Sequence, residues 1–254
     1  MKKFAADLHI HSALSPCAAK EMTPPAIVRA ARERALAMVA VCDHNSARNA
    51  AAVLEAARGQ VAALAGMEIT TAEEAHVLGI FPDAAAAGAA GDEVCATLPE
   101  GGAGAEAFGE QLLMDADGRV LGKETRMLSA ASALTLSDAV NLIHRHGGLA
   151  VAAHVNRPSF SVLSQLGMFP TDVRFDAVEL FVPALALSLP NASPCPRVPA
   201  SDSLPAEVPV IASSDSHFLA DVGRCRTLFE MRAATFAELA LALQGRGGRK
   251  CAYA

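Results

Sequence analysis

The sequence contains few aromatic residues and no excess of positive charge. Of its 254 residues none is Trp and one is Tyr, and aromatic residues make up 4%, so we do not expect an aromatic platform on which nucleic-acid bases stack. The formal net charge of −6 gives no basic surface for a phosphate backbone or an anionic membrane. These absences favour a small, locally bound substrate and argue against nucleic acid as a partner.

Long apolar runs and paired cysteines are also absent. No window approaches the roughly 18 uninterrupted apolar residues of a membrane span, and the N-terminal residues reach Asp7 and His9 too early for a signal peptide. We therefore expect a cytoplasmic protein that makes no contact with membranes. The six cysteines are scattered and none forms a C-x-x-C pair, so we expect free thiols.

The chain has the composition of a folded protein. Hydrophobic residues make up 52% and charged residues 19%, which excludes wholesale disorder. At this length the chain forms one large domain or two small ones. We expect a single domain over residues 1–254.

Short apolar segments alternate with helix-like segments along most of the chain, which is typical of a parallel sheet built from βα units. Such a layout predicts an α/β fold, a (β/α) barrel whose site lies at the C-terminal ends of its strands. Seven strands are expected, at 4–11, 38–42, 62–69, 75–81, 149–153, 177–181 and 210–213, with helices near 24–34, 47–58, 138–146 and 236–243.

Residues 82–136 interrupt this alternation. They begin with an Ala- and Gly-rich stretch and contain a predicted hairpin, 111–114 and 119–122, around an Asp-Gly turn. We interpret this segment as an insertion over the barrel mouth. The proline-rich stretch 183–209 is predicted to be an irregular loop.

Histidines gather at the predicted strand ends. Six of the eight lie at or beside the end of an apolar strand, namely His9, His11, His44, His76, His154 and His217. A single histidine there is ordinarily a structural hydrogen-bonding residue, whereas six predict a metal site. In His9-Ile10-His11 the strand period of two points both imidazoles to one side, so that they reach one ion.

Carboxylates accompany these histidines. Asp215 lies two residues before His217, and Glu68 follows another apolar strand with a carboxylate able to bridge two cations. This mixture of nitrogen and oxygen donors suits zinc, manganese or iron and is too rich in nitrogen for calcium or magnesium. Two such ions polarise a phosphoryl group and generate a hydroxide nucleophile from water, so the pattern indicates phosphoester hydrolysis.

The ordered motifs of this chain resemble those of the PHP (polymerase and histidinol phosphatase) family. The resemblance extends from residue 7 to about 230 and rests on Asp7-Leu8-His9-Ile10-His11-Ser12, Cys42-Asp43-His44-Asn45, Gly66-Met67-Glu68, His76, Ala153-His154 and Ser214-Asp215-Ser216-His217. It implies a distorted, TIM-like seven-stranded (β/α) barrel with two to three divalent metal ions and phosphoesterase activity.

The resemblance also implies which residue serves which ion. His9, His11, Glu68 and Asp215 correspond to the first metal; Glu68, His76 and His154 to the second; His44 and His217 to the third. Many family members complete the third site with an aspartate that follows the first motif, where this chain has Ser15-Pro16-Cys17. Cys17 either binds this ion as a thiolate or leaves the site weak or empty.

Three alternatives remain beside a phosphoesterase of small metabolites or nucleotides. An amidohydrolase needs a mid-barrel lysine, and no lysine lies between Lys20 and Lys123. A nuclease-like phosphodiesterase lacks a basic groove in this sequence. A metal-binding regulatory module without turnover finds its support in the altered segment at Cys17.

The substrate is not apparent from the sequence. Arg157, three residues after His154, is our candidate for a catalytic arginine that contacts the substrate phosphate, and Arg48 is a second candidate. Either arginine also fits a role in stabilising its loop. The sequence does not distinguish a phosphomonoester substrate from a phosphodiester, and it does not identify the metals or the oligomeric state.

Overall fold

The computed structural model describes residues 1–101, 108–181, 204–205 and 207–253. None of the helices in these ranges has both the length and the apolar character that crossing a membrane requires. The strands are β1 Lys2–Ile10, β2 Met38–Val41, β3 Ala62–Thr70, β4 His76–Phe81, β5 Leu112–Met114, β6 Val120–Lys123, β7 Leu149–Ala152, β8 Ala177–Phe181, β9 Val210–Ser213, β10 Thr227–Met231 and β11 Lys250–Tyr253. The α-helices are α1 Pro24–Glu33, α2 Ala50–Ala56, α3 Ala84–Cys95, α4 Leu136–Arg145, α5 Val162–Leu166 and α7 Phe236–Leu243.

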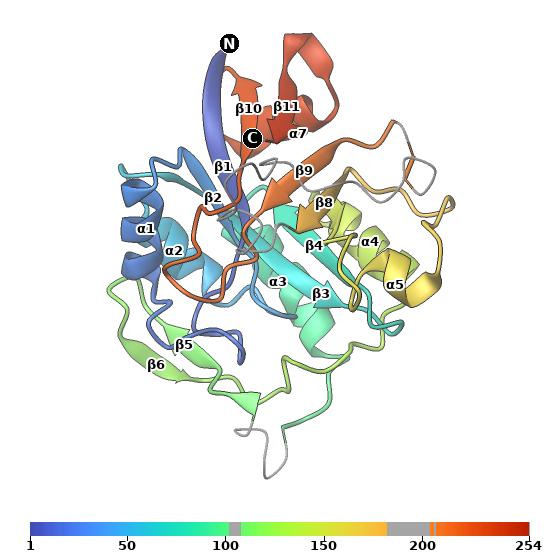
Figure 1. Cartoon of the computed structure of the whole chain (residues 1–254). Coiled ribbons are helices and arrows are strands. Elements are labelled where there is room, and N and C mark those ends of the chain that lie inside the picture. The colour runs from blue at the N-terminus through green and yellow to red at the C-terminus, as the bar shows by residue number, and fades with distance from the viewer. Residues whose placement is uncertain (102–107, 182–203, 206, 254) are drawn as a thin grey trace.

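The main sheet has nine strands in the order β11-β10-β1-β2-β3-β4-β7-β8-β9. The seven predicted strands are therefore neighbours in chain order, which confirms the α/β barrel class. Backbone contacts close the sheet, because the amide of His11 donates to the carbonyl of Ser216 at 2.9 Å and Ile10 bridges Ser216 in parallel. The curved sheet with helices around it is visible in Figure 1.

Strand β4 breaks the parallel pattern. It pairs antiparallel with both β3 and β7, because β3 ends at Thr70 and β4 begins at His76, a connection too short for a parallel crossover. The prediction of uniform βα units is wrong at this point. As a consequence, His76 lies at the N-terminal end of its strand yet at the same rim of the sheet as the C-terminal ends of the neighbouring strands.

Two strands beyond the predicted seven extend the sheet. Strand β10 pairs antiparallel with the N-terminal half of β1, and β11 pairs with β10. Both lie with α7 at one end of the molecule, where the two chain termini also lie (Figure 1). They are far from the C-terminal end of β1, so the metal-site motifs lie at the opposite end of that strand.

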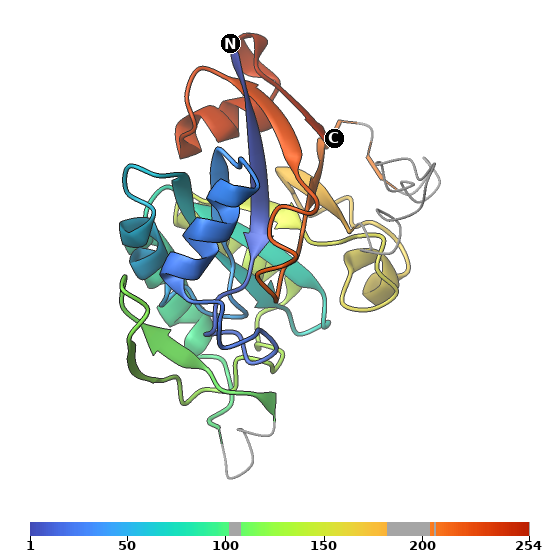
Figure 2. The same ribbon diagram turned by 60° about the vertical axis from the view of Figure 1, so that its left-hand side comes forward.

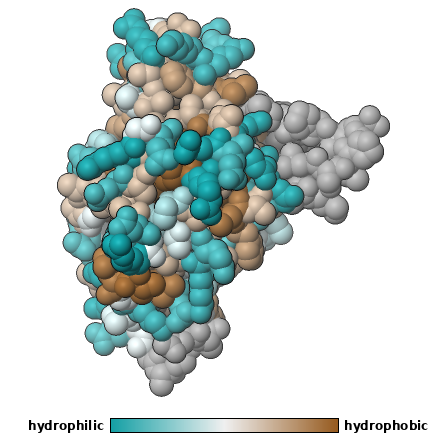
Figure 3. Space-filling view, turned by 90° about the vertical axis from the view of Figure 1, so that its left-hand side faces the viewer, coloured by the Kyte–Doolittle hydropathy of each residue, from teal (hydrophilic) through white to brown (hydrophobic). Residues whose placement is uncertain are grey.

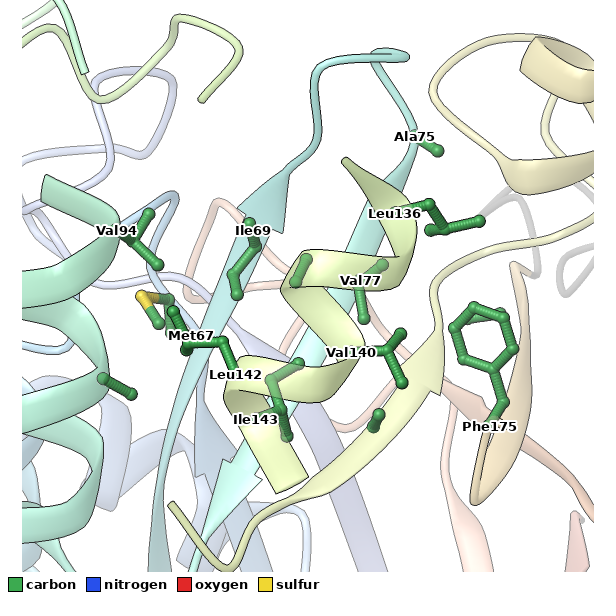
Figure 4. Packing of buried hydrophobic residues seen from close by; sticks show 14 of the residues in the cluster. Met67, Ile69, Ala75, Val77, Val94, Leu136, Val140, Leu142, Ile143 and Phe175 are labelled. Atoms are coloured by element: carbon green, nitrogen blue, oxygen red, sulfur yellow. The ribbon is translucent and has the colours of Figure 1, made fainter. Parts of the chain in front are cut away.

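Helices α3 and α4 pack on β3 and β4 to form the largest apolar cluster. Figure 4 shows Val94 of α3 beside Met67, and Val140 and Ile143 of α4 near Val77. Helix α4 begins after Thr135, whose side chain accepts from the amide of Asp138 and forms a capping box. The helix predicted near 138–146 thus begins two residues earlier, at Leu136.

The segment 82–136 combines a core helix with a peripheral hairpin. Its first part is α3, whose Ala87, Ala90 and Val94 are fully buried. The hairpin β5–β6 lies at the end toward which β1 points, opposite the chain termini (Figure 2). The amide of Leu112 donates to the carbonyl of Ala13 at 2.9 Å, so the hairpin touches the loop after β1. Most of the predicted loop 183–209 lies outside the described residues.

The hairpin carries exposed apolar side chains. Val120 and Leu121 of β6 are 55% and 71% exposed. Figure 3 views the molecule from the side of α1, α2 and the hairpin, and it shows a group of hydrophobic residues among hydrophilic ones toward the end where the hairpin lies. The described cysteines, which are all but Cys195, are free thiols.

Candidate metal centre

Eight of the nine predicted metal ligands meet at one rim of the sheet. The structure forms three groups of potential ligand atoms, each within 4.8 Å of one another. The residues that carry these atoms lie within or directly after β1, follow β2, β7 or β9, lie within β3, or begin β4. Together with His154, which contacts Glu68 at 3.0 Å, they are His9, His11, His44, Glu68, His76, Asp215 and His217.

The first group joins both histidines of β1 to Asp215 and Glu68. The Nε2 atoms of His9 and His11 are 3.1 Å apart and lie 3.4 and 3.2 Å from Asp215 Oδ1. Glu68 completes the group at 3.5 Å from His9 and 3.4 Å from His11. A tetrahedral ion with bonds of about 2.0–2.1 Å separates its ligand atoms by about 3.3–3.4 Å, so these atoms have the spacing of a metal site.

The second group is tighter and is buried like the first. Glu68 Oε1 lies 2.8 Å from His76 Nδ1 and 3.0 Å from His154 Nε2, and these two nitrogens are 3.3 Å apart. Glu68 and His154 are each 1% exposed. Glu68 thus faces both groups, because Oε1 also lies 3.5 Å from His9 and Oε2 lies 3.4 Å from His11, as expected of a bridging carboxylate.

The third group lies toward solvent. It contains His11, His44 and His217, and the rings of His11 and His217 stack with centroids 4.1 Å apart. The thiol of Cys17, an exposed residue, faces the same histidines. Partial burial alone would raise the pKa of this thiol, but hydrogen bonds with His217 and His44 lower it from 9.0 to about 6.

Polar contacts behind the rings fix the orientation of two histidines. His9 Nδ1 donates to Glu179 Oε2 at 2.9 Å, which orients the ring so that Nε2 faces the cluster. His11 Nδ1 lies 2.9 Å from Ser15 Oγ, which donates to Asp43 at 2.7 Å. The sequence did not indicate Glu179, because it is a lone acidic residue within the apolar strand β8.

The electric field of the cluster keeps its carboxylates ionised. Burial opposes ionisation of Glu68, but His76, His9 and His44 hold its pKa well below the usual range. Asp215 has a lowered pKa for the same reason, mainly because of His9. Conversely, burial lowers the pKa of His11, and repulsion from His217 and His44 lowers it further, which leaves its imidazole neutral and able to bind a cation.

Two of the clustered residues have left-handed backbone conformations. His154 has φ 29° and Asp215 has φ 49°, in a region where residues other than glycine are strained by about 1–3 kcal/mol. The chain turns sharply at both positions directly after β7 and β9. Backbone strain is thus concentrated where the ligand side chains must turn inward.

The residues present fit bound cations. Glu68 Oε2 and His154 Nδ1 are buried and have no hydrogen-bond partner among the described residues, although a buried polar atom without a partner is costly. The donors are imidazole nitrogens and carboxylate oxygens, which suit zinc, manganese or iron. Bound cations would use Glu68 Oε2, which lies 3.0 Å from His44 Nδ1, and relieve the crowding of imidazoles.

The predicted arginines have different positions. Arg157 lies at the cluster, where its Nη1 donates to Asp215 Oδ2 at 2.6 Å and its guanidinium lies 5.1 Å from the centre of the Phe181 ring. Arg48 instead pairs with Glu124 at 2.8 Å. Asp7 accepts from the amide and the hydroxyl of Ser214 at 3.0 and 2.6 Å and thereby anchors the loop that carries Asp215.

Residues 206–246 match the family described as PHP-associated. The same chain has a PHP-type fold, since it covers 98% of its length in an alignment with the endonuclease PfuEndoQ from Pyrococcus furiosus, at a TM-score of 0.71 and 21% identity. The chain thus shares the fold of this endonuclease and matches the PHP-associated family over residues 206–246. It covers 58% of that endonuclease chain, so it spans little more than half of its neighbour. No curated protein matches the sequence.

Two further solved structures are similar to this chain. One is Endonuclease Q in complex with a 27-mer duplex that has an abasic lesion at the active site, with a TM-score of 0.67, 20% identity, and coverage of 98% of this chain and 58% of that chain. The other, from Bifidobacterium adolescentis, is described as a metal-dependent phosphoesterase, with a TM-score of 0.52, 18% identity, and coverage of 84% and 87% respectively.

The first of these neighbours overturns one expectation from composition. We had argued against nucleic acid as a partner from the net charge, yet a protein with this fold binds a DNA duplex. The argument was wrong because a net charge averages over the whole surface, whereas a metal cluster attracts a phosphate locally.

Proposed function

We propose that this PHP domain is a metal-dependent phosphoesterase that acts on a small phosphorylated metabolite or a nucleotide. The observation that carries the proposal is the convergence of eight imidazole and carboxylate side chains from six strands and the loops beside them. A structural role would not require so many titratable groups in contact, because burying them is costly unless they are paired or bind metal.

His9, His11, Glu68 and Asp215 would hold one ion, and Glu68, His76 and His154 a second. A third would lie at His44 and His217, with Cys17 beside them. Bound zinc, manganese or iron would supply Lewis acidity and a hydroxide at neutral pH.

The chain's own groups would orient this chemistry. Glu179 and Ser15 hold His9 and His11 so that the Nε2 atoms face the cluster. Arg157 uses one nitrogen for Asp215, and its Nε and Nη2 have no partner among the described residues. Because a guanidinium matches two phosphate oxygens at once, Arg157 would hold the substrate phosphate against the cluster.

A nuclease-like phosphodiesterase is the second candidate function. It is favoured by the similarity to Endonuclease Q with a DNA duplex. The two functions use the same cluster and differ in whether the phosphorus carries one ester bond or two. A third possibility is a regulatory module that binds metal and does not turn over.

Metal analysis of the purified protein, followed by a hydrolysis screen, separates these functions. We expect two to three equivalents of zinc, manganese or iron and metal-dependent release of phosphate. The screen would contain phosphorylated metabolites, nucleotides and oligonucleotides. His9→Ala should abolish turnover, whereas His146→Ala should not, since His146 pairs with Glu93 outside the cluster at 2.6 Å.

The pattern of results identifies the function. Hydrolysis of monoesters supports the first candidate, and cleavage of oligonucleotides alone supports the second. Full metal content without hydrolysis of any phosphoester would contradict both and support a regulatory module. Hydrolysis that persists in His9→Ala would overturn the proposed site.

A further inference from the structure

A cavity of about 310 Å³ opens beside the metal cluster. Cys17, Asp215 and His217 line its inner end, so a molecule in the cavity also reaches the cluster. Its volume is at the lower limit of about 300–1,000 Å³ that is usual for small-molecule sites. The cavity is thus large enough for one compact group attached to the reacting phosphate.

Two phenylalanine rings contribute to the walls of this cavity. Phe181 and Phe218 both line it. Phe218 is 56% exposed, although a phenylalanine side chain gains by leaving water. The Phe181 ring already has the Arg157 guanidinium 5.1 Å from its centre. Rings and a planar cation together provide flat surfaces of the kind on which another planar group stacks.

The charges away from the cluster are balanced. Arg224 and Asp221 line the cavity and form an ion pair at 2.8 Å. They leave no uncompensated charge for a second phosphate or for the ammonium of an amino alcohol. They do offer hydrogen-bond donors and acceptors to a neutral group with a polar edge.

We infer that the cavity binds a nucleobase, so that the substrate is a nucleotide, either free or within a strand. This inference rests on the proposed phosphoesterase function and narrows its substrate class. A nucleobase is planar, neutral and polar at its edge, whereas a sugar ring is puckered and surrounded by hydroxyl groups, and an amino alcohol carries a charge. The low aromatic content of the sequence excluded an extended stacking platform, but a single base needs only the two rings found here.

Substitution of Phe218 tests the inference through substrate discrimination. We expect the wild type to prefer adenosine 5′-monophosphate to ribose 5-phosphate. Phe218→Ala should lower kcat/KM for the nucleotide by about five- to hundredfold, the usual effect of losing one base–aromatic stack. The kcat/KM for ribose 5-phosphate should not change. Met168→Ala, which truncates another exposed apolar side chain (72% exposed) outside this cavity, should change neither.

Calorimetry with adenosine, which has no phosphate, gives a readout that does not require turnover. Adenosine should bind to the wild-type protein and more weakly to Phe218→Ala and Arg224→Gln. An oligonucleotide with a terminal phosphate, assayed in parallel, distinguishes a free nucleotide from one within a strand. The better substrate of the two identifies the source of the base.

The failures of the two proposals are distinguishable. Adenosine binding without hydrolysis of any phosphoester would overturn the phosphoesterase function and leave the cavity assignment standing. Equal use of ribose 5-phosphate and the nucleotide, or an equal effect of Phe218→Ala on both, would overturn the nucleobase inference while hydrolysis stands.

Discussion

The buried and the open sides of the metal cluster differ in how their side chains are held. On the buried side, Glu68 and His76 belong to paired strands, and the side chains of Glu68 and His154 are 1% exposed. On the open side, His44 and His217 lie in loops that follow strands, and their side chains are 13% and 22% exposed. Cys17 also lies in a loop. Strand pairing fixes Glu68 and His76 on the buried side, whereas the open side borders the cavity, where we propose that the substrate enters.

The largest loss of activity is expected from substitution of Glu68, which contacts histidines on both sides of the cluster. Glu68→Gln removes a charge that faces five histidines while keeping nearly the same shape. Because ions at such a site contribute several kcal/mol to catalysis, kcat/KM should fall on the order of a thousandfold or more, with loss of bound metal on both sides. Metal analysis and kinetics check this. Glu124→Gln, a buried carboxylate paired with Arg48, is the matched control.

A smaller loss is expected when the orientation of one ligand on the buried side is disturbed. Glu179 Oε2 accepts from His9 Nδ1 at 2.9 Å and from the amide of His154 at 3.2 Å. Glu179→Gln should therefore weaken metal binding by about 10–100-fold, the usual effect of losing a partner behind a metal-bound histidine. Competition with a chelator measures this affinity. An unchanged affinity would show that Glu179 does not position these ligands.

Glu179 illustrates which features the sequence predicts and which it does not. Period-two spacing in His9-Ile10-His11 and the placement of polar residues at strand ends anticipated the cluster, because those patterns follow from local strand geometry. Glu179 comes from the middle of an apolar segment, and its role depends on the barrel curvature that brings β8 behind His9. No local pattern encodes that contact.

The fold shows the same division between local and distant causes. The seven sheet neighbours were predicted because apolar runs and helix caps are local signals. The reversal of β4 was missed, since it depends on strand pairing across the sheet. Helix α3 was missed because its run of Ala and Gly residues has little hydrophobic periodicity, although Asp83 caps it by accepting from the amide of Ala86 at 2.8 Å.

On the open side, Arg157→Lys should reduce kcat/KM by about tenfold and leave the metal content unchanged. Lysine keeps the charge but loses the planar fork that can hold Asp215 and a phosphate together. Kinetics with the best substrate from the screen check this, together with metal analysis. If kcat/KM is the same as in the wild type, Arg157 does not contact the phosphate.

The smallest effect is expected at Cys17, at the outermost position of the open side. We expect Cys17→Ala to remove one equivalent of metal and to lower hydrolysis only a few-fold, because the ions of the buried side keep all their ligands. Cys17→Asp should restore the stoichiometry and shift the preference toward manganese, a harder ion than zinc. Full metal content and activity in Cys17→Ala would contradict a thiolate ligand.

Alkylation of the metal-free protein tests the position of the Cys17 thiol separately. Hydrogen bonds with His217 and His44 lower its pKa to about 6, so the reactive thiolate forms as the pH rises through that value. Reaction with iodoacetamide should be half-maximal near pH 6, instead of near the ordinary thiol pKa of about 8.5. Cys42 is the internal control, because burial raises the pKa of its thiol and shields it. Added zinc should protect Cys17 from alkylation. If the alkylation midpoint instead lies near the ordinary thiol pKa and zinc gives no protection, the thiol lies away from the histidines. The third ion would then have imidazole ligands alone.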